Sequence, residues 1–266
     1  MVFFSLPDWA LVLIILGIVA GACVVGVALG AMLRAHSDSL SEPFGVVQGA
    51  ILGVVALLLA FGLTLAIGRY EERRAAVVDD ANVIGTTYLR AQTITEPARS
   101  SSIALLRQYG VLALDLSHEI PNSTAMKETE ARQADVQRRL WQLAAGALAR
   151  APTENAPRLY VESLNELINE QTTRVAALNN RVPSAVLGLE LIAAGIALAM
   201  LTLYLSVLGR GHTTVWLAAI LVTGLLLVTF DLDRPTRGVI KLPTAPLTAL
   251  LVVMAQPPAA AAPATH

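Results

Sequence analysis

Four long apolar blocks constrain the fold of this chain more than any other feature of its sequence. They cover residues 9–33, 44–68, 183–209 and 213–230. Each is uncharged or nearly so and has the ~20 residues that a helix needs to cross a hydrocarbon core about 30 Å thick. The whole chain is 55% hydrophobic and only 15% charged, which is outside the usual range of soluble domains. The sequence therefore predicts an all-α, polytopic membrane protein with four transmembrane helices.

The first block does not read as a cleaved signal peptide. Such a peptide has basic residues before its apolar core, whereas the residues before this block include Asp8 and no Lys or Arg. The apolar run is also longer than a signal peptide uses. The single cysteine, Cys23, lies inside this block and excludes an intrachain disulfide. We expect the first block to stay in the membrane.

Signatures of catalysis are missing from the sequence. It contains no phosphate-binding loop, dinucleotide glycine fingerprint, nucleophile elbow or paired-histidine metal motif. A net charge of −1 gives no support to nucleic-acid binding. We expect a protein that is not an enzyme and that needs no cofactor or metal.

The basic residues indicate an orientation. Four spans place both termini and the central region on one side of the membrane. That side has most of the basic residues near the span ends: Arg69, Arg73, Arg74, Arg174, Arg181, Arg234, Arg237 and Lys241, against Arg34 and Arg210 in the short loops. By the positive-inside rule, the central region and both termini are cytoplasmic.

The chain divides by composition into four parts. Residues 1–68 and 183–231 hold the paired spans, residues 69–182 form a cytoplasmic helical region, and residues 232–266 form a cytoplasmic tail that is partly disordered. Within the central region, helical periodicity continues from the second span to about residue 92. Three more helices are expected over 96–117, with Thr95 as N-cap, 123–150 and 158–180. This predicts an all-α bundle.

Glycines recur in the first two spans. They are Gly17, Gly21, Gly26 and Gly30 in the first, and Gly45, Gly49 and Gly53 in the second. Small residues at this spacing let helices approach closely in lipid, so we expect these two spans to pack tightly against each other. The alternative is that glycine is simply common in membrane helices.

Two polar features outside the bundle could be functional. Glu190 is the only acidic residue inside an apolar block, and such residues are by default site candidates. The alternative is a structural ion pair with Arg181. Asp231, Asp233 and Arg234 follow the fourth span, where they either end the helix or dock the tail on the cytoplasmic bundle.

A charged cluster marks the end of the second span. It consists of Arg69, Tyr70, Glu71, Glu72, Arg73 and Arg74, followed by Asp79 and Asn82. An ordinary surface helix with ion pairs such as Arg69 with Glu72 and Glu71 with Arg74 would also explain it. With Gly85, Thr86, Tyr88, Leu89, Arg90 and the segment from Asp231 to Pro235, however, the cluster resembles the bacterial bestrophin-like domain family.

This family has a more distant similarity to bestrophins, which are pentameric ion channels. The resemblance implies a homo-oligomer, by analogy a pentamer, in the bacterial inner membrane, in contact with lipid and monovalent ions. It also implies a pore neck on the second span, formed by Gly53, Leu57 and Phe61. The chain departs from bestrophins at Glu71, where they have a second aromatic residue, and it lacks their calcium clasp.

Helical geometry adds a hypothesis about ion preference. At about 100° per residue, Phe61, Glu72 and Asp79 fall within roughly 20° of one another. An apolar ring would then lie above two carboxylate rings, which favours cations over chloride. The leading interpretation is an ion channel lined by the second span. One alternative is a non-conducting scaffold or sensor acting through its cytoplasmic bundle. Another is an intramembrane enzyme or proton-coupled transporter using Glu190, although the sequence shows no second buried ionisable residue for such a role.

Overall fold

The computed structural model describes residues 7–33, 37–209 and 212–258, and the regular elements in this part of the chain are all helices. Arg34, Arg210 and the tail from residue 259 lie outside the described residues. The helices are α2 (Asp8–Leu33), α3 (Ser37–Ala91), α4 (Ala98–Leu116), α5 (Thr124–Arg150), α6 (Asn155–Asn179), α7 (Ser184–Val207), α8 (His212–Leu232) and α9 (Ala245–Ala255). Among the described residues, four helices are long and apolar enough to cross a membrane. The predicted fold class is confirmed.

The chain forms two compact units. Unit 1 comprises Met1–Arg69 and Arg181–Ile240, and unit 2 comprises Tyr70–Asn180 and Lys241–His266. Helix α3 contributes to both. Its 55 residues far exceed the ~20 that cross a membrane, so the helix continues beyond its apolar segment, as the sequence predicted.

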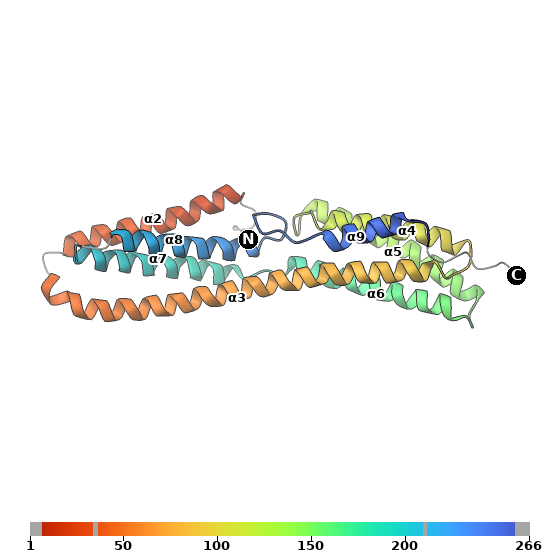
Figure 1. Cartoon of the computed structure of the whole chain (residues 1–266), viewed down its shortest axis with the longest axis horizontal. Coiled ribbons are helices and arrows are strands. Elements are labelled where there is room, and N and C mark those ends of the chain that lie inside the picture. Colours follow the sequence, from red (N-terminus) through yellow and green to blue (C-terminus); the bar gives the residue numbers. More distant parts are fainter. Residues whose placement is uncertain (1–6, 34–36, 210–211, 259–266) are drawn as a thin grey trace. The chain divides into compact units, whose positions relative to one another are not determined.

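Unit 1 is built around α7. Helices α2 and α8 both lie against it (Figure 1), and the side chains of Ile15, Leu187 and Phe230 are buried in this part of the protein. Many other apolar side chains of these helices remain exposed, as expected where lipid replaces water as the solvent.

Two of the glycines of α2 meet α7 rather than α3. A Cβ at Gly26 would overlap the Ala199 carbonyl, and one at Gly30 would lie 2.6 Å from Cβ of Ser206. Gly17 and Gly49 have no such neighbour within 4 Å. The prediction that spans one and two pack tightly was therefore wrong. Small residues enable close approach in lipid, but they do not identify the partner helix.

Unit 2 is a helical bundle with a continuous apolar core. The core takes in the second half of α3 together with α4, α5 and α6, and includes Ile84, Leu106, Tyr109, Leu140 and Tyr160. The Ser123 side chain caps α5 by accepting a hydrogen bond from the Met126 N–H at 3.1 Å.

Two predicted helix starts need correction. The N-cap of α4 is Pro97 rather than Thr95, and the Glu96 carboxylate accepts hydrogen bonds from the Ser100 N–H and hydroxyl. Helix α6 starts at Asn155, earlier than the expected residue 158, because Pro157 fits within the first turn, where its missing N–H costs no helical hydrogen bond.

Helix α9, in the segment expected to be a partly disordered tail, belongs to the core of unit 2. Leu247 and Met254 are buried in it. Gly85 of α3 and Gly110 of α4 make room for Leu250 and Leu251, since a Cβ at these glycines would lie 3.2 Å and 3.0 Å from the leucine side chains. The Tyr88 hydroxyl donates to the Met254 carbonyl at 3.1 Å, which fixes the end of the helix.

Candidate functional site

One face of α3 is uncovered in the single chain. Leu57 and Phe61 lie on it one turn apart, with 56% and 59% of their surface exposed. Gly53, one turn earlier, would have open space around a Cβ. The positions that pack inward are on another side of the helix and include Val55, Leu59 and Ala66. The uncovered face is therefore available to lipid or to another subunit.

Further along α3, two carboxylates line a groove in unit 2. Glu72 and Asp79 are both exposed, and Glu170 of α6 joins them around a cavity of about 720 Å³. Burial and the like charges of Asp79 and Asp80 raise the pKa of Glu170. The groove thus has a negative potential that attracts small cations. Within the described residues, no group of three acidic, histidine or cysteine side chains is placed to hold a metal ion.

Arg73 lies between these carboxylates in sequence, but its guanidinium is engaged elsewhere. Its side chain is 1% exposed and donates to the carbonyls of Ala177 at 3.3 Å and Asn180 at 2.7 Å. These carbonyls end α6, where a cation is favoured by the helix dipole. Arg73 is consequently fixed at the end of α6, and turning it to a different position would break both bonds.

The rest of the charged cluster is mostly at the surface. Glu71 and Arg74 form the expected ion pair at 3.4 Å, with both side chains more than half exposed. Asn82 is exposed and Arg69 is half-buried. Tyr70 packs against a small apolar cluster made of Leu116, Met126, Leu178 and Leu242. The exposed ion pair between Glu71 and Arg74 contributes little to stability.

A buried ion pair in unit 2 was not singled out from the sequence. The Arg174 guanidinium donates to the Asp80 carboxylate, and it also donates to the Ala113 carbonyl at 2.7 Å and the Ser117 hydroxyl at 2.5 Å. Both members of the ion pair are almost completely buried. Burial raises the pKa of the Asp80 carboxyl, and the charge of Arg174 opposes that shift. The arrangement ties together α3, α4 and α6.

Periodicity could have found this pair. Asp80 is three residues after Val77 and four before Ile84, both of which are buried. Arg174 is four residues before the buried Leu178. A charged residue at a core position of an amphipathic helix indicates a buried partner.

The acidic segment after α8 joins helix ends within unit 1. The Asp231 carboxylate accepts hydrogen bonds from the backbone N–H groups of Val239 and Ile240, the latter at 2.7 Å. Gly238 is next to it with φ of +86°, and a Cβ there would overlap this carboxylate. Asp231 thus fixes a tight turn that only glycine fits.

Asp233 and Arg234 extend this junction to two other helices. Asp233 is buried and accepts a hydrogen bond from the Val182 N–H at 2.9 Å, just before α7. Arg234 is also buried and donates to Asp8 at 2.8 Å, at the start of α2. Of the two roles considered from sequence, the segment does end α8, and it also fastens the starts of α2 and α7.

Glu190 is buried inside unit 1. It is 2% exposed, and its carboxylate lies directly against the backbone of Gly62 on α3, where a Cβ would overlap it. Neither carboxylate oxygen has a hydrogen-bond partner among the described residues. The expected ion pair with Arg181 is therefore not formed.

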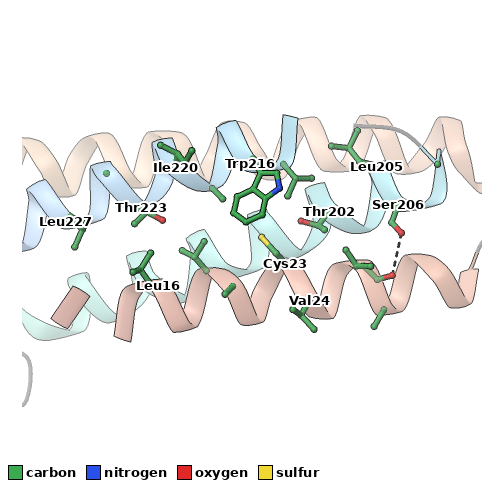
Figure 2. Close-up of a pocket in the computed structure, with 18 residues that line it drawn as sticks. Leu16, Cys23, Val24, Thr202, Leu205, Ser206, Trp216, Ile220, Thr223 and Leu227 are labelled. Atoms are coloured by element: carbon green, nitrogen blue, oxygen red, sulfur yellow. Dashed lines mark hydrogen bonds between the residues drawn. The ribbon is translucent and has the colours of Figure 1, made fainter. Parts of the chain in front are cut away.

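An apolar cavity of about 900 Å³ lies between α2, α7 and α8. Figure 2 shows Leu16, Val24, Ile220 and Leu227 around it, with Cys23 and Trp216. The Ser206 hydroxyl donates to the Val27 carbonyl at 3.4 Å, and the Thr202 hydroxyl donates to the Leu198 carbonyl at 2.6 Å. A cavity lined in this way suits hydrocarbon and offers an ion no replacement for its hydration shell.

Comparison with known proteins gives a consistent result. The family model of the Bestrophin-like domain matches residues 13–247. Comparison with curated proteins finds no match. The chain is similar to crystal structures of a bacterial bestrophin homologue from Klebsiella pneumoniae. For the structure solved by Zn-SAD phasing, the TM-score is 0.62 at 13% identity over 88% of this chain and 95% of that chain.

Structures of two point variants of the homologue give similar values. In one, the TM-score is 0.65 at 14% identity over 89% of this chain and 98% of that chain. In the other, it is 0.63 at 13% identity over 89% and 96%. At this level of identity the likeness establishes a shared fold.

Proposed function

Since this chain belongs to the bestrophin-like family, we propose that it forms an oligomeric ion channel whose pore is lined by α3. Bestrophins are ion channels, and the shared fold supports the same type of activity here. The observation that carries the proposal is the uncovered face of α3, where Leu57 and Phe61 are more than half exposed. If other helices of the same chain covered this face of α3, the helix would have no free surface with which to line a pore between subunits.

Several properties of unit 1 favour a pore between subunits over one within a subunit. Its large cavity is apolar, and two of the hydroxyls lining it already bond to backbone carbonyls. A closed symmetric oligomer brings identical surfaces around one axis, so each exposed residue of α3 becomes a ring. By family resemblance the oligomer is a pentamer.

Rings of Leu57 and Phe61 would form the neck. An apolar constriction can gate ion flow by losing its water, and it needs no catalytic residue. Gly53 would widen the pore one turn away, because it has no side chain. The neck can therefore separate conducting from non-conducting states without a charged residue in the constriction itself.

Rings of Glu72 and Asp79, supported by Glu170, would favour cations over chloride. The groove formed by these three carboxylates is negative, and Arg73 is held by the carbonyls at the end of α6. Arg73 is therefore unable to reverse the sign without losing two hydrogen bonds. Monovalent cations are the proposed permeant ions, with chloride as the second choice.

The proposed location is the bacterial inner membrane, with unit 2 and both termini in the cytoplasm. The excess of basic residues on that side of the spans supports this orientation. Residues 1–68 and 183–231 would then hold the spans, and residues 69–182 the cytoplasmic region.

Ion preference can be measured as a reversal potential under a potassium chloride gradient. We expect the wild-type protein in lipid bilayers to show a potential towards that of potassium. Glu72→Gln combined with Asp79→Asn should reduce the potassium-to-chloride permeability ratio by roughly fivefold, since a nearby unit charge contributes about 1 kcal/mol in water.

The matched control removes two exposed carboxylates of α5 that do not line the groove, by Glu128→Gln combined with Asp135→Asn. It should leave the ratio unchanged. A wild-type potential near that of chloride, unmoved by the groove variant, would contradict the cation preference.

A further inference from the structure

Glu190 is a carboxyl group in an unusual environment for a charge. It lies about two turns into α7, in one of the four apolar helices, and is 2% exposed. Its two carboxylate oxygens make no hydrogen bond within the described residues. Burying an ionised carboxylate without a partner is so costly that such groups bind a proton or move.

Ionisable residues on the surrounding elements are engaged elsewhere or make no bond to Glu190. Asp8 at the start of α2 pairs with Arg234, Asp231 accepts from the Val239 and Ile240 amides, and Asp233 accepts from the Val182 amide. Arg69 on α3, and Arg181 and Arg237 near the ends of α7 and α8, donate no hydrogen bond to Glu190. Within the part of the chain that the structure describes, no cationic side chain forms a hydrogen bond with Glu190, so its charge can be neutralised by a proton.

The carboxyl group is in contact with the helix proposed to line the pore. Gly62 has no side chain, which lets Glu190 lie against the α3 backbone. Gly62 directly follows Phe61, and the two positions point about 100° apart around the helix. Gly62 is thus on the packed side of α3 while Phe61 is on the uncovered side. A movement of α3 away from the carboxyl at Gly62 would also move Phe61, because the two residues are adjacent in one helix.

We propose that Glu190 is a proton-binding site that controls the neck at Phe61. This rests on the proposed channel function. With the proton bound, the neutral carboxyl packs against Gly62 and the neck stays closed. When the proton leaves to the solvent, the carboxylate needs water, separates α7 from α3 at this point and opens the neck. Ion flux then rises as the pH rises.

The test uses the full-length protein in lipid vesicles and measures potassium flux from about pH 5 to about pH 9, the range over which buried carboxyls titrate. Wild-type flux should increase by at least about tenfold across this range, equivalent to one pKa unit of coupling. Glu190→Gln keeps the shape but has no titratable proton, and its flux should be low at every pH.

Glu128→Gln is the matched control, because it makes the same change in an exposed carboxyl of α5 that lines neither the groove nor the proposed pore. It should keep the pH dependence of potassium flux.

A second pair of variants changes glycines instead of carboxyls. Gly62→Ala should displace the carboxyl and raise flux at acid pH, whereas Gly21→Ala on α2, which has open space around its Cβ and is outside the proposed pore, should not.

Infrared difference spectroscopy provides a readout that does not depend on conduction. A protonated-carboxyl band should disappear on raising the pH in the wild type and be absent in Glu190→Gln. If neither form conducts but the band behaves in this way, the channel proposal fails and the proton site stands. A Glu190→Gln protein with the wild-type pH profile, or with the wild-type carboxyl band, would overturn the proton site.

Discussion

Replacing Arg174 by methionine should lower the free energy of unfolding by about 3–5 kcal/mol, the usual cost of removing one member of a buried ion pair. Methionine keeps much of the volume of the arginine stem but leaves the Asp80 carboxylate buried without its cation. The Ala113 carbonyl and the Ser117 hydroxyl lose a donor at the same time. Chemical unfolding of the full chain in detergent, followed by circular dichroism, measures the effect.

The control is Arg138→Met, which removes an exposed arginine that pairs with Asp135 at 3.3 Å. Exposed pairs contribute about 0–1 kcal/mol, so its stability should change little. Adding Asp80→Asn to Arg174→Met should recover part of the loss, because the unpaired charge is gone. Equal losses for Arg174→Met and Arg138→Met would show that the buried pair does not stabilise unit 2.

The Arg174→Met variant should also acquire a distinct pH dependence. Burial raises the folded-state pKa of Asp80, and without Arg174 nothing opposes that shift. A carboxyl whose pKa is higher in the folded state stabilises the fold at low pH and loses this contribution as the pH rises through the folded pKa. The destabilisation should therefore be smallest at acid pH and grow towards neutral pH.

Leu57→Ala combined with Phe61→Ala should increase ion flux by at least about tenfold, because a barrier lower by about 1.4 kcal/mol already gives that factor. The reason is that two apolar rings shrink in every subunit, so the constriction becomes wider and holds water more easily. Flux of potassium through reconstituted vesicles measures it, with oligomer size checked on the same sample.

The matched control is Ile192→Ala combined with Ile196→Ala, which removes two exposed apolar side chains one turn apart on α7. These positions are outside the proposed pore, and flux should stay at the wild-type level. Equal flux in the neck variant and the wild type, with the oligomer intact, would contradict the proposed neck. So would an equal increase in the α7 control.

Much of the fold could be predicted because its signals are local. Uncharged blocks long enough to cross a membrane predicted the four spans. The end of α4 follows from Pro121 and Asn122, the latter with φ of +64°, and Ser123 begins the next helix as its cap. Each signal acts within a few residues, so no knowledge of tertiary contacts was needed.

Which helices pack against each other was harder to predict from the sequence. The glycine spacing in α2 correctly indicated close helix packing, but the surface of Ala199 and Ser206 on α7 that accepts it lies far away in sequence. Helix α9 was missed because an 11-residue apolar segment is too short for a span and is followed by prolines. Its burial depends on gaps at Gly85 and Gly110, which sequence periodicity does not reveal.

The candidate site, likewise, could be predicted only where it depends on a single helix. Helical phase placed Phe61, Glu72 and Asp79 on one face, since that depends on α3 alone. The contact between Gly62 and Glu190 depends on how α7 meets α3, and sequence suggested Arg181 as the partner instead. Likewise, the role of Arg73 depends on where α6 ends in space.

Single-channel recording from the purified wild-type protein, with subunit number determined on the same preparation, tests the central claim most directly. A conducting oligomer should give discrete current steps of uniform size in a planar bilayer. A monomer or dimer that inserts into the bilayer and passes no current at any pH would contradict the channel and favour a membrane-anchored scaffold or sensor.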